Sequence, residues 1–214
     1  MTQSTAFSML TYEQQAKREG FDFIIGVDEA GRGPLAGPVV AAAVFLKSES
    51  FQNTIRDSKK ISALQREKAF DEIQANAQVG VGLVSEGIID QCNILQATYQ
   101  AMNIAVTELL GKILTNEAAP DLRRKVCLLI DGNSFKTDLR VAYKTIIGGD
   151  DLSLSIACAS IIAKVTRDRI LNEYDKVYPQ YGFSKHKGYP TPEHKLAIKK
   201  HGLSQIHRKT FNSV

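Results

Sequence analysis

The feature that most constrains the fold is a pair of short apolar runs separated by a loop rich in glycine and proline. Residues 23–27 (FIIGV) lead into Asp28 and Glu29, and residues 39–46 (VVAAAVFL) form the second run. Runs of this length with β-branched residues favour buried strands over helices. The glycines and prolines of residues 31–38 interrupt regular structure. The sequence therefore predicts two strands, with two acidic side chains where the first one ends.

The rest of the chain alternates strand-like runs with helical patterns. Further strands are expected over residues 79–84, 126–130 and 143–147. Helical spacing of apolar residues predicts helices over residues 63–77, 93–114, 153–175 and 192–200. Ser62 and Thr191 are suitable N-caps for two of these helices, and Pro192 suits a first helical position. This order predicts an α/β fold with a sheet of about five strands.

Acidic side chains follow three of the predicted strands. They are Asp28 and Glu29, then Asp131, then Asp150 and Asp151. The carboxyl ends of strands are where sites form in open α/β sheets, and converging carboxylates repel one another unless cations lie between them. Oxygen ligands select Mg²⁺ or Mn²⁺, and two such ions about 4 Å apart promote phosphodiester cleavage.

Each acid also has a purely structural interpretation. Asp131-Gly132 is an ordinary turn signal, and Asp150 or Asp151 would suit the cap of the following helix. The repeated placement at strand ends favours a metal site over these separate roles.

The loop Gly31-Arg32-Gly33-Pro34-Leu35-Ala36 matches the G-x-G-x-x-G/A pattern of dinucleotide-binding proteins. That pattern needs the loop to open a helix, whereas here Gly37-Pro38 and a strand-like run follow. A rigid loop whose backbone closely approaches a sugar-phosphate, with Arg32 supplying charge, is the better interpretation. A plain structural turn remains the alternative.

The positive charge of the chain is concentrated at its C-terminal end. Residues 185–214 hold seven Lys or Arg residues against one acid, a net charge of +6, while the rest of the chain carries −2. Such asymmetry indicates either a polyanionic partner or a solvated basic surface. Phe183 and Tyr189 are interleaved with this charge, where they would stack on a nucleotide or serve as packing residues. The four histidines of this segment lie among lysines, which disfavours a zinc site.

Cysteine usage and the apolar runs bear on the compartment. Cys92, Cys127 and Cys158 are far apart and include no CxxC pair, which favours buried reduced thiols and a cytoplasmic location. The polar N-terminus lacks the pattern of a signal peptide, and the apolar runs are too short to span a membrane. No membrane role is expected.

Taken together, the motifs resemble those of bacterial ribonuclease HII, the type 2 family of ribonucleases H. The matching segments, in order, are GVDEAGRGPLAGPV (26–39), DSKK (57–60), IDGN (130–133), GD (149–150), ASIIAKVTRD (159–168), YGF (181–183) and HKGYPT (186–191). The resemblance implies an RNase H-like fold with a central mixed sheet flanked by helices. It also implies one catalytic domain over residues 1–214, with a core of about 21–180 and a basic helical extension of about 181–214.

The resemblance also assigns site residues. It implies four metal-binding catalytic carboxylates, with Asp150 preferred over Asp151 because it lies six residues before Ile156: Asp28, Glu29, Asp131 and Asp150. Gly31, Arg32 and Gly33 would contact the ribonucleotide and its 2′-hydroxyl, and Tyr189 would stack on the next sugar. Further candidates for phosphate contacts are Lys59, Lys60, Lys164 and Arg167. For Arg167, a core ion pair with Asp168 is the alternative.

The implied activity is hydrolysis of the RNA strand of RNA/DNA hybrids and incision 5′ of ribonucleotides embedded in duplex DNA. We expect two-metal hydrolysis with Mg²⁺ or Mn²⁺, in which Asp28 bridges both ions and the products carry 3′-hydroxyl and 5′-phosphate ends. The enzyme is expected to be a monomer that serves ribonucleotide removal in DNA replication and repair. The competing hypotheses are a non-catalytic nucleic-acid-binding module that uses the basic segment alone, and a dinucleotide-dependent oxidoreductase.

Overall fold

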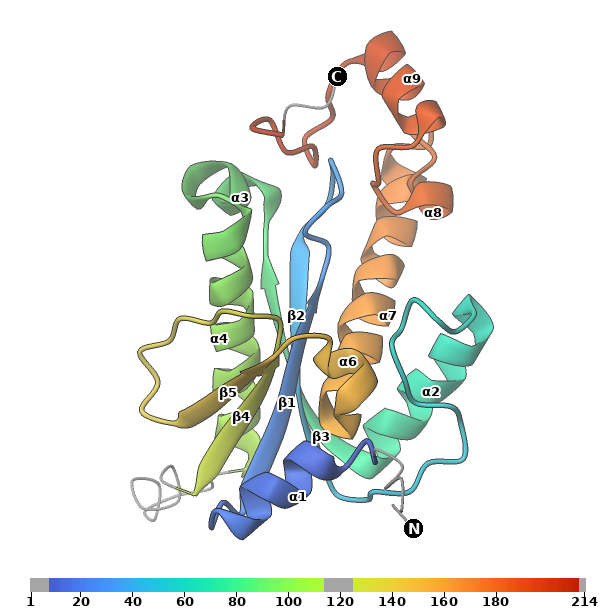
Figure 1. Cartoon of the computed structure of the whole chain (residues 1–214). Coiled ribbons are helices and arrows are strands. Elements are labelled where there is room, and N and C mark those ends of the chain that lie inside the picture. Colours follow the sequence, from blue (N-terminus) through green and yellow to red (C-terminus); the bar gives the residue numbers. More distant parts are fainter. Residues whose placement is uncertain (1–7, 114–124, 212–214) are drawn as a thin grey trace, which may run out of the picture.

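The computed structural model describes residues 8–113 and 125–211 (Figure 1). Its strands are β1 (Phe23–Ala30), β2 (Val39–Leu46), β3 (Ala77–Val84), β4 (Val126–Asp131) and β5 (Ala142–Ile146). Its helices are α1 (Thr11–Arg18), α2 (Ala63–Asn76), α3 (Glu86–Cys92), α4 (Ile94–Ile113), α6 (Gly149–Leu152), α7 (Leu154–Val177), α8 (Phe183–His186) and α9 (Pro192–His201).

Every strand and helix expected from the sequence is present in the described part of the chain, with ends within three residues of the prediction. Residue 114, the predicted end of one helix, lies outside the described residues. Ser62 caps α2 and Thr191 caps α9, each accepting a backbone N–H with its side chain. Four helices were not predicted, namely α1, α3, α6 and α8. The longest of them has eight residues, too few for a helical period to stand out.

The five strands form one mixed sheet in the order β3-β2-β1-β4-β5. β1 pairs antiparallel with β2 and parallel with β4, and β5 is parallel to β4. The predicted mixed sheet of about five strands is therefore confirmed. Because β1 and β4 run in the same direction, with Val27 paired to Ile130, Asp28 and Asp131 emerge side by side at the same edge.

Helices cover both faces of the sheet, with α4 on one side and α7 and α2 on the other (Figure 1). Side chains of a strand alternate between faces, so Ile25 and Val27 pack on the α4 side while Gly26 and Asp28 face α7. A Cβ at Gly26 would lie 2.1 Å from the carbonyl carbon of Ser155 in α7. This close approach holds β1 directly against α7, beside Asp28.

Two glycines in β3 weaken its strand pattern in the sequence, and the structure explains them. A Cβ at Gly80 would lie 2.1 Å from the carbonyl oxygen of Ala105, and one at Gly82 would lie 1.9 Å from that of Ala101. Both carbonyls belong to α4. The glycines are therefore the residues that let α4 lie close to the edge strand.

The C-terminal segment packs on the loop between β1 and β2 at the end of α7 (Figure 1). Phe183 is fully buried there with Leu35, Leu171 and Ile198, which confirms the packing interpretation for Phe183. Backbone hydrogen bonds join Gly37 N to the Ile206 carbonyl at 2.9 Å, and Arg208 N to the Leu35 carbonyl at 2.8 Å. Part of the basic segment is thus built into the fold.

The three cysteines are free; Cys127 and Cys158 are buried and Cys92 is half-buried. Among the described helices, none combines the length and the apolar character needed to cross a membrane.

Candidate active site

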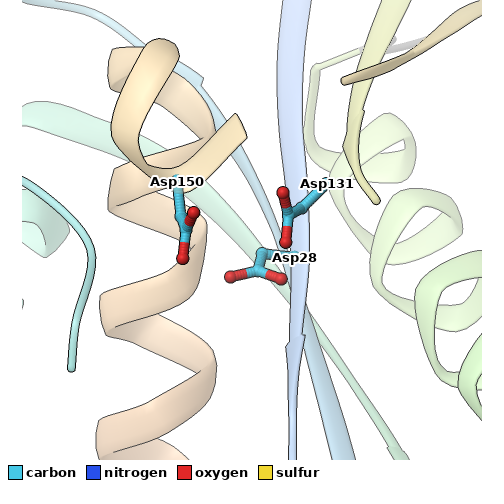
Figure 2. A group of neighbouring side chains, drawn as sticks. All are labelled: Asp28, Asp131 and Asp150. Carbon is cyan, nitrogen blue, oxygen red and sulfur yellow. The ribbon is translucent and has the colours of Figure 1, made fainter. Parts of the chain in front are cut away.

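Three carboxylates converge at the carboxyl edge of the sheet (Figure 2). Asp28 comes from β1, Asp131 from the end of β4 and Asp150 from α6. One carboxylate oxygen from each lies within 4.8 Å of the other two. Asp28 and Asp150 are 4% and 7% exposed. Within the described residues, this is the group of His, Cys, Asp and Glu side chains whose spacing suits a metal ion.

Asp150 reaches the cluster by a different route from the one predicted. It does not end β5, because β5 stops at Ile146 and the chain then turns through Gly148 in the left-handed region (φ +68°) into α6. The Asp131 carboxylate accepts the Gly149 N–H at 2.7 Å, which fixes the start of α6 beside β4. Neither Asp150 nor Asp151 caps the following helix, because Ser153 caps α7.

The cluster is electrostatically strained without a cation. Burial raises the pKa of Asp28 well above its usual value, and the charges of Glu29 and Asp131 raise it further. Burial, with the charges of Asp131 and Asp57, raises the pKa of Asp150 to about 6. Hard divalent cations are the groups that carboxylates gathered in this way accommodate best. The donor set therefore fits Mg²⁺ or Mn²⁺.

Glu29 lies next to this trio but is not part of it. Its carboxylate accepts a hydrogen bond from Arg32 Nη1 at 3.2 Å. Burial raises the pKa of Glu29, and the charge and hydrogen bond of Arg32 oppose that shift. The structure thus brings together three of the four carboxylates named from the resemblance and leaves the fourth paired with an arginine of the glycine loop.

A pocket of about 280 Å³ opens beside the carboxylates. It is lined by Glu29, Ala30, Gly31, Arg32, Gly33, Ser58, Lys59, Ser160, Lys164 and Tyr189. Six of the eight residues expected to bind substrate lie in this one pocket. Ser58 and Ser160, whose hydroxyls are 2.9 Å apart, were not singled out from the sequence because serines carry no distinctive spacing.

The lysines around the pocket each face an acid. Lys59 Nζ lies 3.7 Å from Asp150, and Lys60 pairs with Asp151 outside the pocket. Lys164 pairs with Asp168 at 2.7 Å and also lies 5.9 Å from the centre of the Tyr189 ring. Tyr189 is 42% exposed, so its ring is available on the pocket wall.

Arg167 is placed differently from either sequence expectation. It is 1% exposed and donates to the backbone carbonyls of Ala36, Pro38 and Lys187. Burial lowers its pKa to about 10. A phosphate contact is therefore wrong for Arg167, since the guanidinium is enclosed, and its hydrogen bonds go to carbonyls while Asp168 pairs with Lys164.

The glycine loop has no dinucleotide-binding geometry. It runs into β2 at Val39 rather than opening a helix. Gly31 and Gly37 have φ values of +102° and +87°, which side chains rarely adopt. Arg208 donates hydrogen bonds to the carbonyls of this loop. In the sequence, Arg208 is one of the charges of the basic segment and has no specific role.

Two of the four C-terminal histidines, His194 and His207, form a hydrogen-bonded chain, and burial lowers the pKa of both. His194 Nδ1 donates to the Tyr189 carbonyl at 2.9 Å, so its Nε2 accepts from His207 Nε2 at 3.1 Å. His207 Nδ1 accepts from the Ser204 N–H at 2.9 Å. His186 stacks on His194 with ring centres 4.3 Å apart. Every ring nitrogen of His194 and His207 thereby has a hydrogen-bond partner within the fold.

Comparisons with known proteins agree on one family. The family model described as Ribonuclease HII matches residues 25–214. The chain is 53% identical over 204 residues to the ribonuclease HII of Ruminiclostridium cellulolyticum, covering 95% of this chain and 75% of that protein. It is 50% identical over 208 residues to the ribonuclease HII of Geotalea uraniireducens, covering 97% and 90%.

Solved structures share the fold. The ribonuclease H2 of Pyrococcus horikoshii OT3 superimposes with a TM-score of 0.67 at 25% identity, covering 89% of this chain and 94% of that one. Bst-RNase HIII in complex with Mn²⁺ gives a TM-score of 0.69 at 15% identity, covering 92% and 70%. The chain belongs to the ribonuclease HII family and is a ribonuclease H, an endonuclease that hydrolyses the RNA strand of RNA/DNA hybrids.

Proposed function

We propose that this ribonuclease also incises duplex DNA on the 5′ side of a single embedded ribonucleotide. Two divalent cations, Mg²⁺ or Mn²⁺, would be held by Asp28, Glu29, Asp131 and Asp150. The observation that carries the proposal is the convergence of three of these carboxylates within 4.8 Å, next to a pocket lined by the glycine loop.

The chemistry that divalent cations supply in such a site is activation of water and stabilisation of the leaving oxygen. The residues of the chain would position and charge the site at which the cations act. Asp28 lies between the other two donors on a strand held against α7, so its position is fixed by the core. Lys59, 3.7 Å from Asp150, adds positive charge at the rim of the cluster, where a phosphate would enter. The expected products carry 3′-hydroxyl and 5′-phosphate ends.

The pocket is proposed to recognise the ribonucleotide. RNA differs from DNA at a given nucleotide by its 2′-hydroxyl, which both donates and accepts hydrogen bonds. Gly31, Arg32 and Gly33 line the pocket, and Gly33 places no side chain between its backbone and a sugar bound there. The Tyr189 ring also lines the pocket and lies directly beside Gly33, since a Cβ at Gly33 would be 3.7 Å from its Cε1 atom. Tyr189 is proposed to stack on the next sugar.

Phosphate contacts are proposed for the lysines at and near the pocket, Lys59, Lys60 and Lys164. Exposed lysines of the C-terminal extension, about residues 181–214 of a single catalytic domain, would neutralise phosphates farther along the duplex. We further propose a monomer that acts in the cytoplasm, in ribonucleotide removal during DNA replication and repair. Three free cysteines among the described residues fit a reducing compartment.

The test uses a labelled DNA duplex that carries one ribonucleotide, incubated with Mg²⁺, Mn²⁺ or EDTA. Cutting on the 5′ side of that ribonucleotide with metal, none in EDTA, and an intact all-DNA duplex are the expected results. Cutting in EDTA would contradict the metal site, and an untouched ribonucleotide duplex beside a cleaved RNA/DNA hybrid would contradict the proposed substrate. Binding without any cutting would favour the non-catalytic module.

A further inference from the structure

Arg208 is enclosed by the loop that lines the substrate pocket. The side chain is 2% exposed, and its guanidinium makes five hydrogen bonds to backbone carbonyls. Nη2 donates to Gly31 at 2.6 Å and Nη1 donates to Arg32 and Pro34 at 3.0 and 2.8 Å. Nε and Nη2 both donate to Gly37, at 3.0 and 2.8 Å. A guanidinium has five N–H groups, so each one is matched by one of these bonds.

The bonds to Gly31 and Arg32 set the direction of the loop's amides. All peptide bonds of the described chain are trans, so a carbonyl and the N–H that follows it point to opposite sides. The Gly31 and Arg32 carbonyls turn toward Arg208, and the N–H groups of Arg32 and Gly33 therefore point the other way. Those two residues line the pocket, where an acceptor on a sugar or phosphate would meet their amides.

A buried charge is a costly way to hold a loop. Burial lowers the pKa of Arg208 to about 9, and the charge of neighbouring Arg167 contributes. Removing a guanidinium from water is unfavourable unless its hydrogen bonds are complete. Arg208 therefore keeps its charge at neutral pH and uses it on loop carbonyls rather than on solvent or nucleic acid.

We propose that Arg208 is a positioning residue of the ribonuclease reaction, which orients the Gly31–Gly33 amides toward the ribonucleotide. This inference rests on the proposed function of the glycine loop. It also assigns a second role to the C-terminal extension, which completes the substrate-reading loop as well as supplying surface charge.

The first test is Arg208→Lys, which keeps the charge but concentrates three donors on one nitrogen that cannot span four carbonyls. kcat on the single-ribonucleotide duplex should fall by about ten- to a hundredfold, the cost of a small misplacement. KM should change less than about twofold because the tail's charge is retained. The matched charge control is Lys200→Ala at the exposed end of α9. It should raise KM modestly and leave kcat unchanged.

Stability is separated from positioning by measuring kcat per folded molecule at two temperatures below unfolding, with the folded fraction taken from circular dichroism. A positioning role keeps the kcat deficit at both temperatures. A merely structural role predicts that kcat returns to the wild-type value once Arg208→Lys is fully folded, and that result would overturn the inference.

A second variant covers the case in which Arg208→Lys does not fold. Asp90 accepts the backbone N–H groups of Lys209 and Thr210 at 2.9 and 3.0 Å and the Thr210 hydroxyl at 2.7 Å. Asp90→Ala loosens this anchor next to Arg208 without touching the guanidinium. A smaller loss in kcat at unchanged KM is expected, and wild-type kcat in folded Asp90→Ala would overturn the inference. Failure of the wild-type protein to cut the duplex would instead contradict the proposed function.

Discussion

Gly31 leaves the space that the side chain of Arg167 fills. A Cβ at Gly31 would lie 2.1 Å from Arg167 Nε and 2.8 Å from the Pro38 carbonyl oxygen. The φ angle of Gly31, +102°, is also one that side chains rarely adopt. Glycine is therefore required at position 31 for two reasons: the backbone conformation there, and the space that the buried side chain of Arg167 occupies.

Gly31→Ala should destabilise the protein by about 2–4 kcal/mol, the combined cost of an unfavourable φ and of overpacking. The matched control is Gly33→Ala, where a Cβ would meet the Tyr189 ring at an ordinary 3.7 Å. Its free energy of unfolding should stay within about 0.5 kcal/mol of the wild-type value. Urea denaturation of the two variants makes the comparison, and equal stabilities would contradict the account of the loop.

The metal-free carboxylate cluster should lower the stability of the protein above about pH 6. The folded-state pKa of Asp150, about 6, lies above its unfolded value of 3.8. Stability is therefore greatest below pH 3.8 for this group and falls as the pH rises through 6. In EDTA at pH 8, Asp150→Asn should raise the free energy of unfolding by about 1–3 kcal/mol, and the gain should vanish at pH 4. Adding Mg²⁺ should raise the Tm of the wild type more than that of the variant. A destabilised Asp150→Asn protein in EDTA would show that burial and repulsion of the Asp150 charge do not limit the stability of the metal-free protein.

Acid should unfold the C-terminal segment through its buried histidines. Burial, with the neighbouring His194, lowers the pKa of His207 to about 4, below its unfolded value of 6.5. Protonation of His207 is less favourable in the folded than in the unfolded state. Its contribution to the free energy of unfolding is therefore constant above pH 6.5 and is lost as the pH falls from 6.5 to 4. The loss attributable to His207 is about 3 kcal/mol at most. His207→Asn should flatten the pH dependence of unfolding over this range, whereas replacement of the exposed His201 by Gln should leave it as in the wild type.

The Tyr189 ring should contribute to substrate binding rather than to folding, because it is 42% exposed. Tyr189→Ala removes a stacking surface worth about 1–3 kcal/mol and should raise KM on the single-ribonucleotide duplex roughly tenfold or more. Tyr189→Phe keeps the ring and should stay close to the wild-type KM. Steady-state kinetics separate the two variants, and an equal loss in both would assign the effect to the hydroxyl instead.

Much of the fold could be predicted from local patterns in the sequence. The apolar runs of β1 and β4 each end at an acid, and parallel pairing of these strands places Asp28 beside Asp131. Caps at Ser62 and Thr191 mark their helices because a side-chain oxygen at that position satisfies a backbone N–H. Each of these patterns depends on residues that are close together in the chain, so it can be recognised in the sequence alone.

What the sequence did not reveal depends on distant contacts. Asp150 was predicted as a site residue, but at the end of a strand. It lies instead on α6, a four-residue helix too short for periodicity, whose first residue Gly149 donates its N–H to Asp131. In the sequence, Arg208 is one of several positive charges near the C-terminus. Only the fold shows that it is buried and bonded to Gly31, 177 positions away along the chain. The resemblance supplied both the loop and the carboxylates, but not the guanidinium behind the loop.

The most direct test of the carboxylate centre compares Asp28→Asn with Asp151→Asn on the single-ribonucleotide duplex in Mg²⁺. Asp28 lies in the converging trio, whereas the more exposed Asp151 pairs with Lys60 outside the pocket. Asp28→Asn is expected to bind the duplex without cutting it, and Asp151→Asn is expected to cut at close to the wild-type rate. Full cleavage by Asp28→Asn would contradict the central claim.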